Sequence, residues 1–208
     1  MEQLVEKILF LKQGPASKIV YERLVEFRSV GSGSDLDLFK ELCFCLLTAN
    51  YTSAGGIRIQ KEIGDGFLHL TQEDLAKRLK TLGHRFPNAR SKYIVAARKH
   101  STNLKSTLAS MKDQKEMRSY LAENVLGLGY KEASHFLRNI GYLDVAILDF
   151  HIIDVLVSNK VIRRPKNLSK KNYLAIEKKL QKLADATTLS QGELDFYLWY
   201  LETGKILK

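Results

Sequence analysis

The stretch Leu121–Ser158, LAENVLGLGYKEASHFLRNIGYLDVAILDFHIIDVLVS, decides the fold because it places a Gly-x-Gly turn between two helical patterns. Apolar residues at helical spacing end at Leu126, and Gly127-Leu128-Gly129 interrupts them with the residue type that most readily takes a positive φ. A new helical pattern starts near Tyr130. The stretch therefore predicts a helix, a short hairpin and a second helix.

Such a hairpin can bind DNA without reading its sequence. The backbone N–H groups of the hairpin and the positive N-terminus of the second helix point outward, where a phosphate oxygen can bind. Gly127 and Gly129 are therefore candidate contacts to the DNA backbone. Basic side chains can add to this surface, although most such charges are only solvated. The candidates between positions 83 and 100 are Arg85, Arg90, Lys92 and Arg98.

Two charged residues of the same stretch are candidates for catalysis. Lys131 closely follows the second glycine, and Asp149 directly follows the apolar run 145–148. Both are expected to face the DNA strand that the hairpin binds. A lysine amine can act as a nucleophile that forms a Schiff base, and a carboxylate can stabilise positive charge at a reacting carbon. Each has a simpler explanation: a lysine is usually a solvated charge, and Asp149 is well placed to cap the next helix.

These motifs resemble those of the helix-hairpin-helix DNA glycosylase superfamily. Its bifunctional members carry apolar-Gly-apolar-Gly-x-Lys, here 126–131, and a downstream Asp-x-His, here 149–151. The resemblance extends over nearly the whole chain. Four further stretches are similar to the archaeal-type 8-oxoguanine DNA glycosylases with AP lyase activity: ELCFCLLTAN (41–50), GHRF (83–86), KEASHF (131–136) and WYLETGKILK (199–208).

The resemblance implies a base excision repair enzyme acting on double-stranded DNA that contains 8-oxoguanine or abasic sites. Such an enzyme must flip the damaged nucleotide out of the duplex to reach C1′. Lys131 would then release the base through a Schiff base and cleave the strand by β-elimination, with Asp149 assisting. The resemblance also implies a monomer.

The resemblance further indicates which residues recognise the base. Phe86 and Trp199 are expected to stack on it, with Asp195 and the final residue Lys208 at its polar edge. Two alternatives stay open. Leucines at helical spacing around Trp199 could place it in the core, and the last residue of a chain is ordinarily frayed.

No tightly bound cofactor is expected. Some members of the superfamily carry a C-terminal iron–sulfur cluster, but the C-terminal region here has no cysteine, so no cluster is expected. Cys43 and Cys45 are expected to be buried thiols in a protein of a reducing compartment. His151 is expected in the core or behind the site rather than on a metal. By resemblance, the hairpin carbonyls could hold a monovalent cation, and these belong to Glu123, Val125 and Leu128.

The composition fits a DNA-binding globular protein. The 208 residues are 45% hydrophobic and 27% charged, and 33 Lys and Arg against 23 Asp and Glu give a net charge of +10, which favours a polyanionic partner. No apolar run approaches the ~20 residues of a membrane span, and the N-terminal stripe is interrupted by charges. We expect a cytoplasmic, nucleoid-associated protein with no export signal and no membrane contact.

The fold class is predicted to be all-α, with two helical subdomains and the helix-hairpin-helix at the cleft between them. By resemblance, residues 1–34 and 144–208 form one subdomain and 35–143 the other, ending in the helix-hairpin-helix at about 114–141. The composition GSGS at 31–34 predicts a linker. Helical patterns cover approximately 2–12, 16–28, 36–49, 53–63, 71–81, 88–100, 113–125, 150–158, 169–183 and 190–202.

Two other functions remain compatible with parts of this pattern. A monofunctional glycosylase would need the hairpin and Asp149 but no lysine nucleophile. A non-catalytic DNA-binding module would need only the hairpin and the net charge, and the pair Lys131 and Asp149 would then be superfluous.

Overall fold

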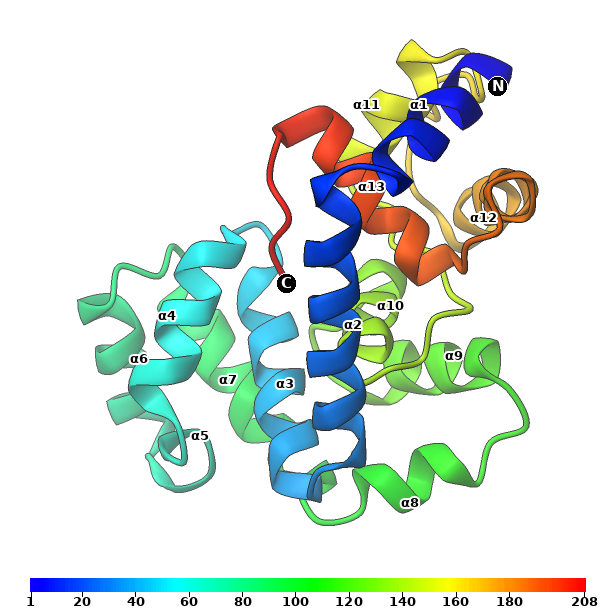
Figure 1. The fold of residues 1–208 in the computed structure, drawn as a ribbon. Helices are drawn as coiled ribbons and strands as arrows, with labels where there is room; N and C mark the ends of the chain where they lie inside the picture. The colour runs from blue at the N-terminus through cyan, green and yellow to red at the C-terminus, as the bar shows by residue number, and fades with distance from the viewer.

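The computed structural model describes residues 1–208 and contains helices and no strands, which confirms the all-α prediction. Helices α9 and α10 form the predicted helix-hairpin-helix (Figure 1). In chain order the helices are α1 (Glu2–Lys12), α2 (Pro15–Ser32), α3 (Asp35–Thr48), α4 (Ser53–Ile63), α5 (Gly66–His69), α6 (Gln72–Thr81), α7 (Pro87–Ala97), η1 (Arg98–His100), α8 (Leu104–Ala109), α9 (Gln114–Asn124), α10 (Tyr130–Asn139), α11 (Phe150–Ser158), α12 (Lys170–Thr187) and α13 (Gln191–Thr203).

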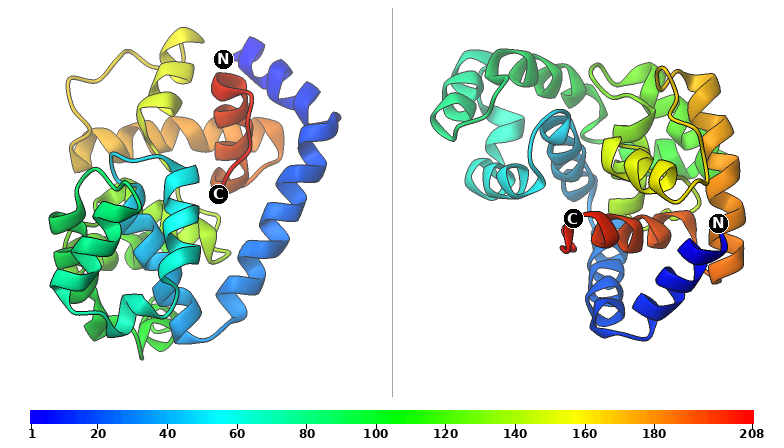
Figure 2. Two further views of the ribbon diagram at one scale, coloured as in Figure 1. Left: turned by 90° about the vertical axis from the view of Figure 1, so that its left-hand side faces the viewer. Right: turned by 90° about the horizontal axis from the view of Figure 1, so that it is seen from above.

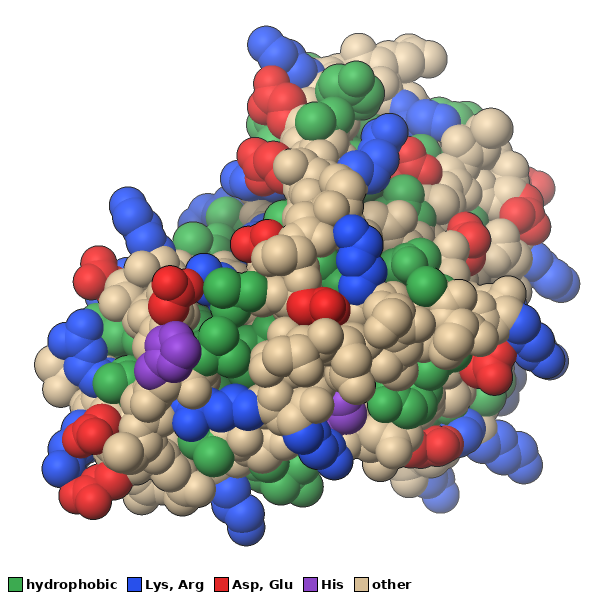
Figure 3. All heavy atoms as spheres, turned by 90° about the horizontal axis from the view of Figure 1, so that it is seen from below, with side chains coloured by type: hydrophobic (Ala, Val, Ile, Leu, Met, Phe, Trp, Pro, Cys, Tyr) green, Lys and Arg blue, Asp and Glu red, His purple; other side chains and the backbone are tan.

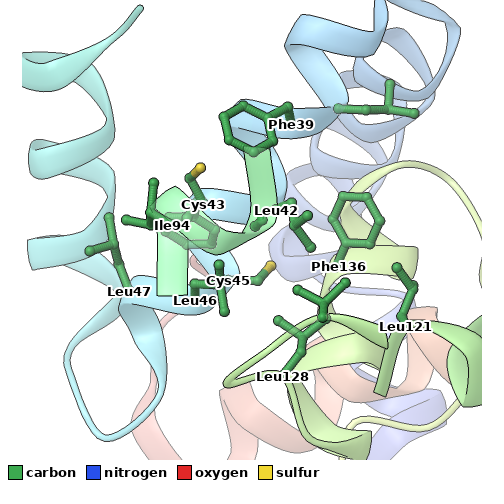
Figure 4. Close-up of a cluster of buried hydrophobic side chains, with 14 of the residues drawn as sticks. Phe39, Leu42, Cys43, Cys45, Leu46, Leu47, Ile94, Leu121, Leu128 and Phe136 are labelled. Atoms are coloured by element: carbon green, nitrogen blue, oxygen red, sulfur yellow. The ribbon is translucent and has the colours of Figure 1, made fainter. Parts of the chain in front are cut away.

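The buried apolar side chains form two clusters. One lies within residues 38–145, around the almost wholly buried helix α3, and Figure 4 shows part of it. The other combines residues 4–27 with residues 146–198. In Figure 1, α1, α11, α12 and α13 gather at the upper right, while α4 to α7 lie at the left. The division into two subdomains stays a prediction, and this distribution of core residues supports it.

The first half of the expected linker at 31–34 is helix. Helix α2 continues through Gly31 to Ser32, and only Gly33 and Ser34 separate it from α3. Gly31 serves a close helix approach, because a Cβ there would lie 2.0 Å from the carbonyl oxygen of Ile140 at the end of α10. A glycine-serine run looks like a linker, but here the glycine is required by packing.

Two short helices were not predicted, α5 and α8. They have 4 and 6 residues, which is too short for a helical period to be recognised in the sequence. At the start of α6, the Thr71 hydroxyl accepts a hydrogen bond from the Asp74 amide. The Asp74 carboxylate accepts one from the Thr71 hydroxyl, so only half of a capping box is formed.

Two buried ion pairs join the helix-hairpin-helix to the C-terminal helices. Arg118 of α9 pairs with Glu177 of α12, and Arg138 of α10 pairs with Asp195 of α13. Each arginine also lies over aromatic rings, including Tyr130 for Arg118 and Phe196 for Arg138. These pairs fix the orientation of α9 and α10 relative to the second cluster.

Cys43 and Cys45 are free and buried, as predicted. Figure 4 shows both thiols among the apolar side chains of the first cluster. Burial raises the pKa of each thiol well above its ordinary value, so both remain protonated and unreactive. None of the helices has both the length and the apolar character that a membrane span requires.

Candidate active site

The hairpin between α9 and α10 leaves the N-terminus of α10 open. Helix α9 ends at Asn124, and the Leu128 amide donates to the Val125 carbonyl across the turn. Gly127 has φ +86°, whereas Gly129 is extended, so only one of the two glycines uses the left-handed region. Gly129 caps α10 without any side-chain hydrogen bond, which leaves the first amides of the helix available to an anion.

The two glycines should respond differently to replacement by alanine. A Cβ on Gly127 would meet the Tyr93 ring at 2.3 Å and would strain its positive φ, whereas one on Gly129 would meet only the flexible Glu132 carboxylate at 3.1 Å. We expect Gly127→Ala to weaken binding to lesion and undamaged duplexes alike, by about tenfold or more, and Gly129→Ala to be milder. Fluorescence anisotropy with both duplexes measures this. A loss of binding confined to lesion DNA would contradict sequence-independent phosphate binding by the hairpin.

A cavity of about 780 Å³ opens beside the hairpin. Its walls come from the start of α4 and the end of α3, from α10, and from α11, α13 and the C-terminal tail. Its size falls within the range of small-molecule pockets, so it can accept one extrahelical nucleotide base. Among the predicted site residues, those lining it are Arg85, Lys131, Asp149, Asp195, Trp199 and Lys208.

Lys131 and Asp149 reach this cavity from two helix N-termini. Lys131 lies in the first turn of α10, half-buried, and its ammonium group forms no hydrogen bond or ion pair with the protein. Asp149 is the N-cap of α11 and accepts the Ile152 amide at 2.9 Å, which confirms the predicted cap. The cap leaves carboxylate lone pairs free, and Asp149 still lines the cavity. Cap and cavity residue are therefore compatible roles.

Asp195 lines the cavity but is already engaged. Its carboxylate pairs with Arg138, and the residue is only 8% exposed. Burial raises the pKa of Asp195 to about 6, and the Arg138 cation opposes that rise. The sequence did not reveal Arg138 as its partner, because the two residues come from different helices far apart in the chain.

Trp199 is half-buried and lines the cavity, so the alternative that placed it in the core is wrong. The His151 ring packs edge-on against it at 4.6 Å between centroids. His151 was expected in the core or behind the site, but it is exposed and lines the cavity itself. The physical reason is its place in the first turn of α11, on the side opposite the buried Ile152 and Ile153.

Phe86 does not line the cavity. It is 39% exposed, and the guanidinium groups of Arg85 and Arg90 lie 5.3 Å and 5.8 Å from its ring centroid. Arg90 is buried and donates to the Ala49 carbonyl, so it is not a phosphate contact. Arg98 is likewise committed to carbonyl oxygens, those of residues 67 and 70. Arg85 and Lys92 stay exposed.

The last residue is held rather than frayed. The Lys208 ammonium donates to Glu41 at 2.6 Å and to Gln60 at 2.8 Å, and the residue lines the cavity. Glu41 was not predicted as a site residue. The sequence indicates it only by a single acid at the start of the apolar run ELCFCLL, because burying a charge is costly unless the charge is paired.

His135 is a further cavity residue that the sequence did not single out. It is buried on α10, and its Nδ1 has no hydrogen-bond partner. Burial lowers its pKa well below the ordinary value, with the Arg138, Lys131 and Lys208 cations acting in the same direction. His135 is therefore neutral at pH 7.

The contribution of the buried histidines to the free energy of unfolding should fall as the pH drops from 7 to 5, whereas protonation of Asp195, whose pKa is raised to about 6, acts in the opposite direction. The unfolded chain binds a proton on His135 near pH 6.5 and the folded chain does not, so acid favours unfolding by up to about 1.4 kcal/mol per pH unit. Burial also lowers the pKa of His84 and His100. Urea unfolding at several pH values measures how the free energy of unfolding changes with pH. This pH dependence should be weaker in His135→Gln and unchanged in the exposed control His69→Gln. The same pH dependence in both variants would contradict the assignment.

The charge excess does not form a single patch on the face in Figure 3. Lys and Arg side chains are scattered over it and lie between acidic side chains. At the candidate site itself, the positive features that can bind a DNA phosphate are the open N-terminus of α10 and the basic residues that line the cavity. No group of three or more His, Cys, Asp or Glu side chains is placed to hold a metal ion.

The fold and this site define a class, that of helix-hairpin-helix proteins with a lysine and an aspartate at a base-sized cavity. The family profile described as 8-oxoguanine DNA glycosylase matches residues 20–189. The chain belongs to this family of bifunctional DNA glycosylases and AP lyases.

Relatives similar over the whole length of the chain support its membership of this family. An 8-oxoguanine DNA glycosylase/AP lyase of Methanocaldococcus jannaschii is 52% identical, with 99% of each chain covered. One of Korarchaeum cryptofilum is 47% identical, over 100% of this chain and 99% of the other. The crystal structure of the M. jannaschii glycosylase/lyase in complex with a 15-mer DNA containing 8-oxoguanine is similar with a TM-score of 0.96 at 51% identity, covering 99% of this chain and 100% of that one.

Proposed function

We propose that this protein flips 8-oxoguanine out of duplex DNA into the cavity, excises it, and cleaves the abasic strand. The observation that carries the proposal is the meeting of Lys131, Asp149 and Trp199 around one base-sized cavity, next to an open helix N-terminus. The hairpin would bind the phosphates on one side of the flipped nucleotide, and the cavity would receive the base.

In the proposed reaction, Lys131 is the nucleophile. Its amine attacks C1′, the glycosidic bond breaks, and the base leaves with the bonding electrons and takes up a proton. The C1′–O4′ bond then breaks, O4′ takes up a proton, and the opened sugar remains bound to the lysine through C1′ as a protonated Schiff base. Removal of a proton from C2′ expels the 3′ phosphate and cleaves the strand. The attack requires the neutral form of the amine, because only that form has a free electron pair.

Base recognition would come from the opposite side of the cavity. Trp199 offers a face for stacking, and Lys208 lines the cavity where the polar edge of the base would lie. Asp195 would act mainly through its pair with Arg138. A stacking role for Phe86 requires its turn to approach the cavity when DNA binds.

The hairpin offers ligands for a monovalent cation. The carbonyl oxygens of Glu123 and Leu128 accept no hydrogen bond, and that of Val125 accepts one from the Leu128 amide. Carbonyl oxygens suit such an ion, so these three fit the group. A bound cation would add positive charge beside the DNA phosphate. One chain supplies every residue of the proposed site, so we also propose that the protein acts as a monomer.

Borohydride trapping tests the proposal directly. The protein is incubated with duplexes containing 8-oxoguanine, an abasic site or unmodified guanine, and borohydride reduces any Schiff base to a stable amine. We expect covalent complexes with the first two duplexes and none with guanine. Strand cleavage without trapping would reject the lysine mechanism, and equal trapping on guanine would reject the base preference.

Asp149→Asn should slow base release about 10²- to 10⁴-fold. The substitution removes the negative charge near C1′, but asparagine is also a good N-cap, so the bond from the Ile152 amide can be kept. Single-turnover excision kinetics measure the rate, and thermal unfolding checks that α11 is intact. A nearly normal rate would leave Asp149 as a helix cap only.

A further inference from the structure

A basic segment without acidic residues connects α11 to α12. Residues 159–171, NKVIRRPKNLSKK, contain six Lys and Arg and no Asp or Glu, whereas the whole chain has 33 Lys and Arg in 208 residues. Figure 2 shows this basic segment as an open loop that leaves α11 and reaches the start of α12. Its basic side chains are all exposed: Lys160, Arg163, Arg164, Lys166, Lys170 and Lys171. A run of surface charges is commonly only solvated, so the placement of this one decides whether it has a partner.

The backbone of the basic segment is held by apolar anchors. Ile162 is buried, and Leu168 packs against the second cluster of core residues. Beside Leu168, the Asn167 side chain accepts from the Ser169 amide, and its carbonyl accepts from the Asn172 side chain. These contacts turn the apolar side chains inward and leave the charged ones in solvent. Because the backbone is already ordered, a ligand that binds the charges has little loop to order.

The cations of the basic segment have few partners within the protein. Arg164 pairs with Asp154, and Lys170 lies 3.4 Å from a carboxylate oxygen of Glu123. The charged groups of the other four form no ion pair and no hydrogen bond: Lys160, Arg163, Lys166 and Lys171. Unpaired like charges near one another repel, and a polyanion such as DNA relieves that repulsion.

The basic segment borders both parts of the candidate site. Leu168 lines the cavity that would receive the base. The Lys170 ammonium lies 5.3 Å from the ring centroid of Tyr130, the first residue of α10, which follows Gly129 at the open helix N-terminus. A duplex with a phosphate at this N-terminus and a base in the cavity therefore brings its backbone beside the basic segment.

We propose that the basic segment is a second site for the DNA backbone, which binds phosphates of the lesion strand next to those bound by the hairpin. The choice of strand rests on the proposed function. The contacts are made by side-chain charges rather than by backbone amides, so they add affinity without reading sequence. They supply no group to the reaction.

Arg163→Gln combined with Lys166→Gln tests this site, because both charges are exposed and unpaired. The matched control is Lys178→Gln combined with Lys182→Gln, which removes two exposed charges farther along α12 and leaves the same net charge. Fluorescence anisotropy at several salt concentrations measures the affinity for 8-oxoguanine and undamaged duplexes. With both duplexes, the slope of log affinity against log salt should become shallower by about 2 in the first pair, about 1 for each charge, and stay unchanged in the control.

Two results of this measurement would overturn the proposal. An unchanged slope in the first pair would mean that the basic segment binds no phosphate, and an equal change in both pairs would mean that only net charge matters. The exchange Arg163→Lys with Lys166→Arg keeps both charges and should keep the slope; a shallower slope there would also count against binding by charge. Excision by saturating protein should change less than about twofold in the first pair. Slower excision with an unchanged slope would place these residues in the reaction instead.

Neutral methylphosphonates test the strand. Replacing single phosphates beside 8-oxoguanine should reveal a position in the lesion strand that weakens binding to the unaltered protein but not to Arg163→Gln with Lys166→Gln. Such positions in the complementary strand alone would overturn the choice of strand. Borohydride trapping separates this site from the proposed reaction. Failed trapping with the expected difference in slope rejects the reaction and keeps the site, whereas successful trapping without that difference rejects the site and keeps the reaction.

Discussion

Lys131→Gln should abolish the borohydride-trapped complex and reduce strand cleavage at abasic sites by about 10³-fold or more. The substitution removes the only amine that the structure places at the start of α10 in the cavity. Since the Lys131 ammonium has no protein partner, its loss should leave the fold intact. Glutamine keeps most of the side chain's length, so binding to duplex DNA should persist.

The measurement is trapping on 8-oxoguanine and abasic duplexes, with anisotropy for binding and thermal unfolding for stability. Lys80→Gln, on the exposed surface of α6, is the matched control and should trap normally. Persistent trapping by Lys131→Gln would point to a different amine. Loss of trapping together with loss of folding would also count against the assignment, because the side chain would then be needed by the structure.

Arg118→Met should lower the free energy of unfolding by about 3–5 kcal/mol. Arg118 is 1% exposed and bonds both oxygens of Glu177, and its guanidinium lies 4.9 Å from the Tyr130 ring centroid. Glu177 also accepts the Ala146 amide at 2.9 Å. Removing the arginine leaves a buried carboxylate without its counter-charge, and this is the main cause of the expected loss.

Denaturant unfolding measures the effect. The control Arg23→Met removes a partly exposed arginine paired with Glu26 within α2 and should cost less than about 1 kcal/mol. Adding Glu177→Met to Arg118→Met should recover part of the stability, because the unpaired charge is then gone. A loss below about 1 kcal/mol for Arg118→Met alone would mean that water reaches Glu177 and replaces the arginine.

Much of the fold is determined by local sequence. Helical periodicity, capping residues and glycines place nearly every long helix within a few residues, because these signals act over one or two turns. The same locality explains the candidate pair, since Lys131 and Asp149 both lie directly at predicted helix starts. It also explains the errors. Helices α5 and α8 are too short to show a helical period. Gly31 was predicted to lie in a linker because its contact with Ile140 depends on tertiary packing.

Only the tertiary structure decides which distant groups meet. Three ion pairs join common charged residues whose spacing in the chain does not indicate that they pair. They are Arg138 with Asp195, Arg118 with Glu177, and Lys208 with Glu41. Their partners are selected by burial, because a charge removed from water must find an opposite charge nearby. The sequence by itself determined the helices and the hairpin that present Lys131 and Asp149. Packing decided that Trp199 and His151 line the cavity, that Phe86 does not, and that the chain's last residue is bound.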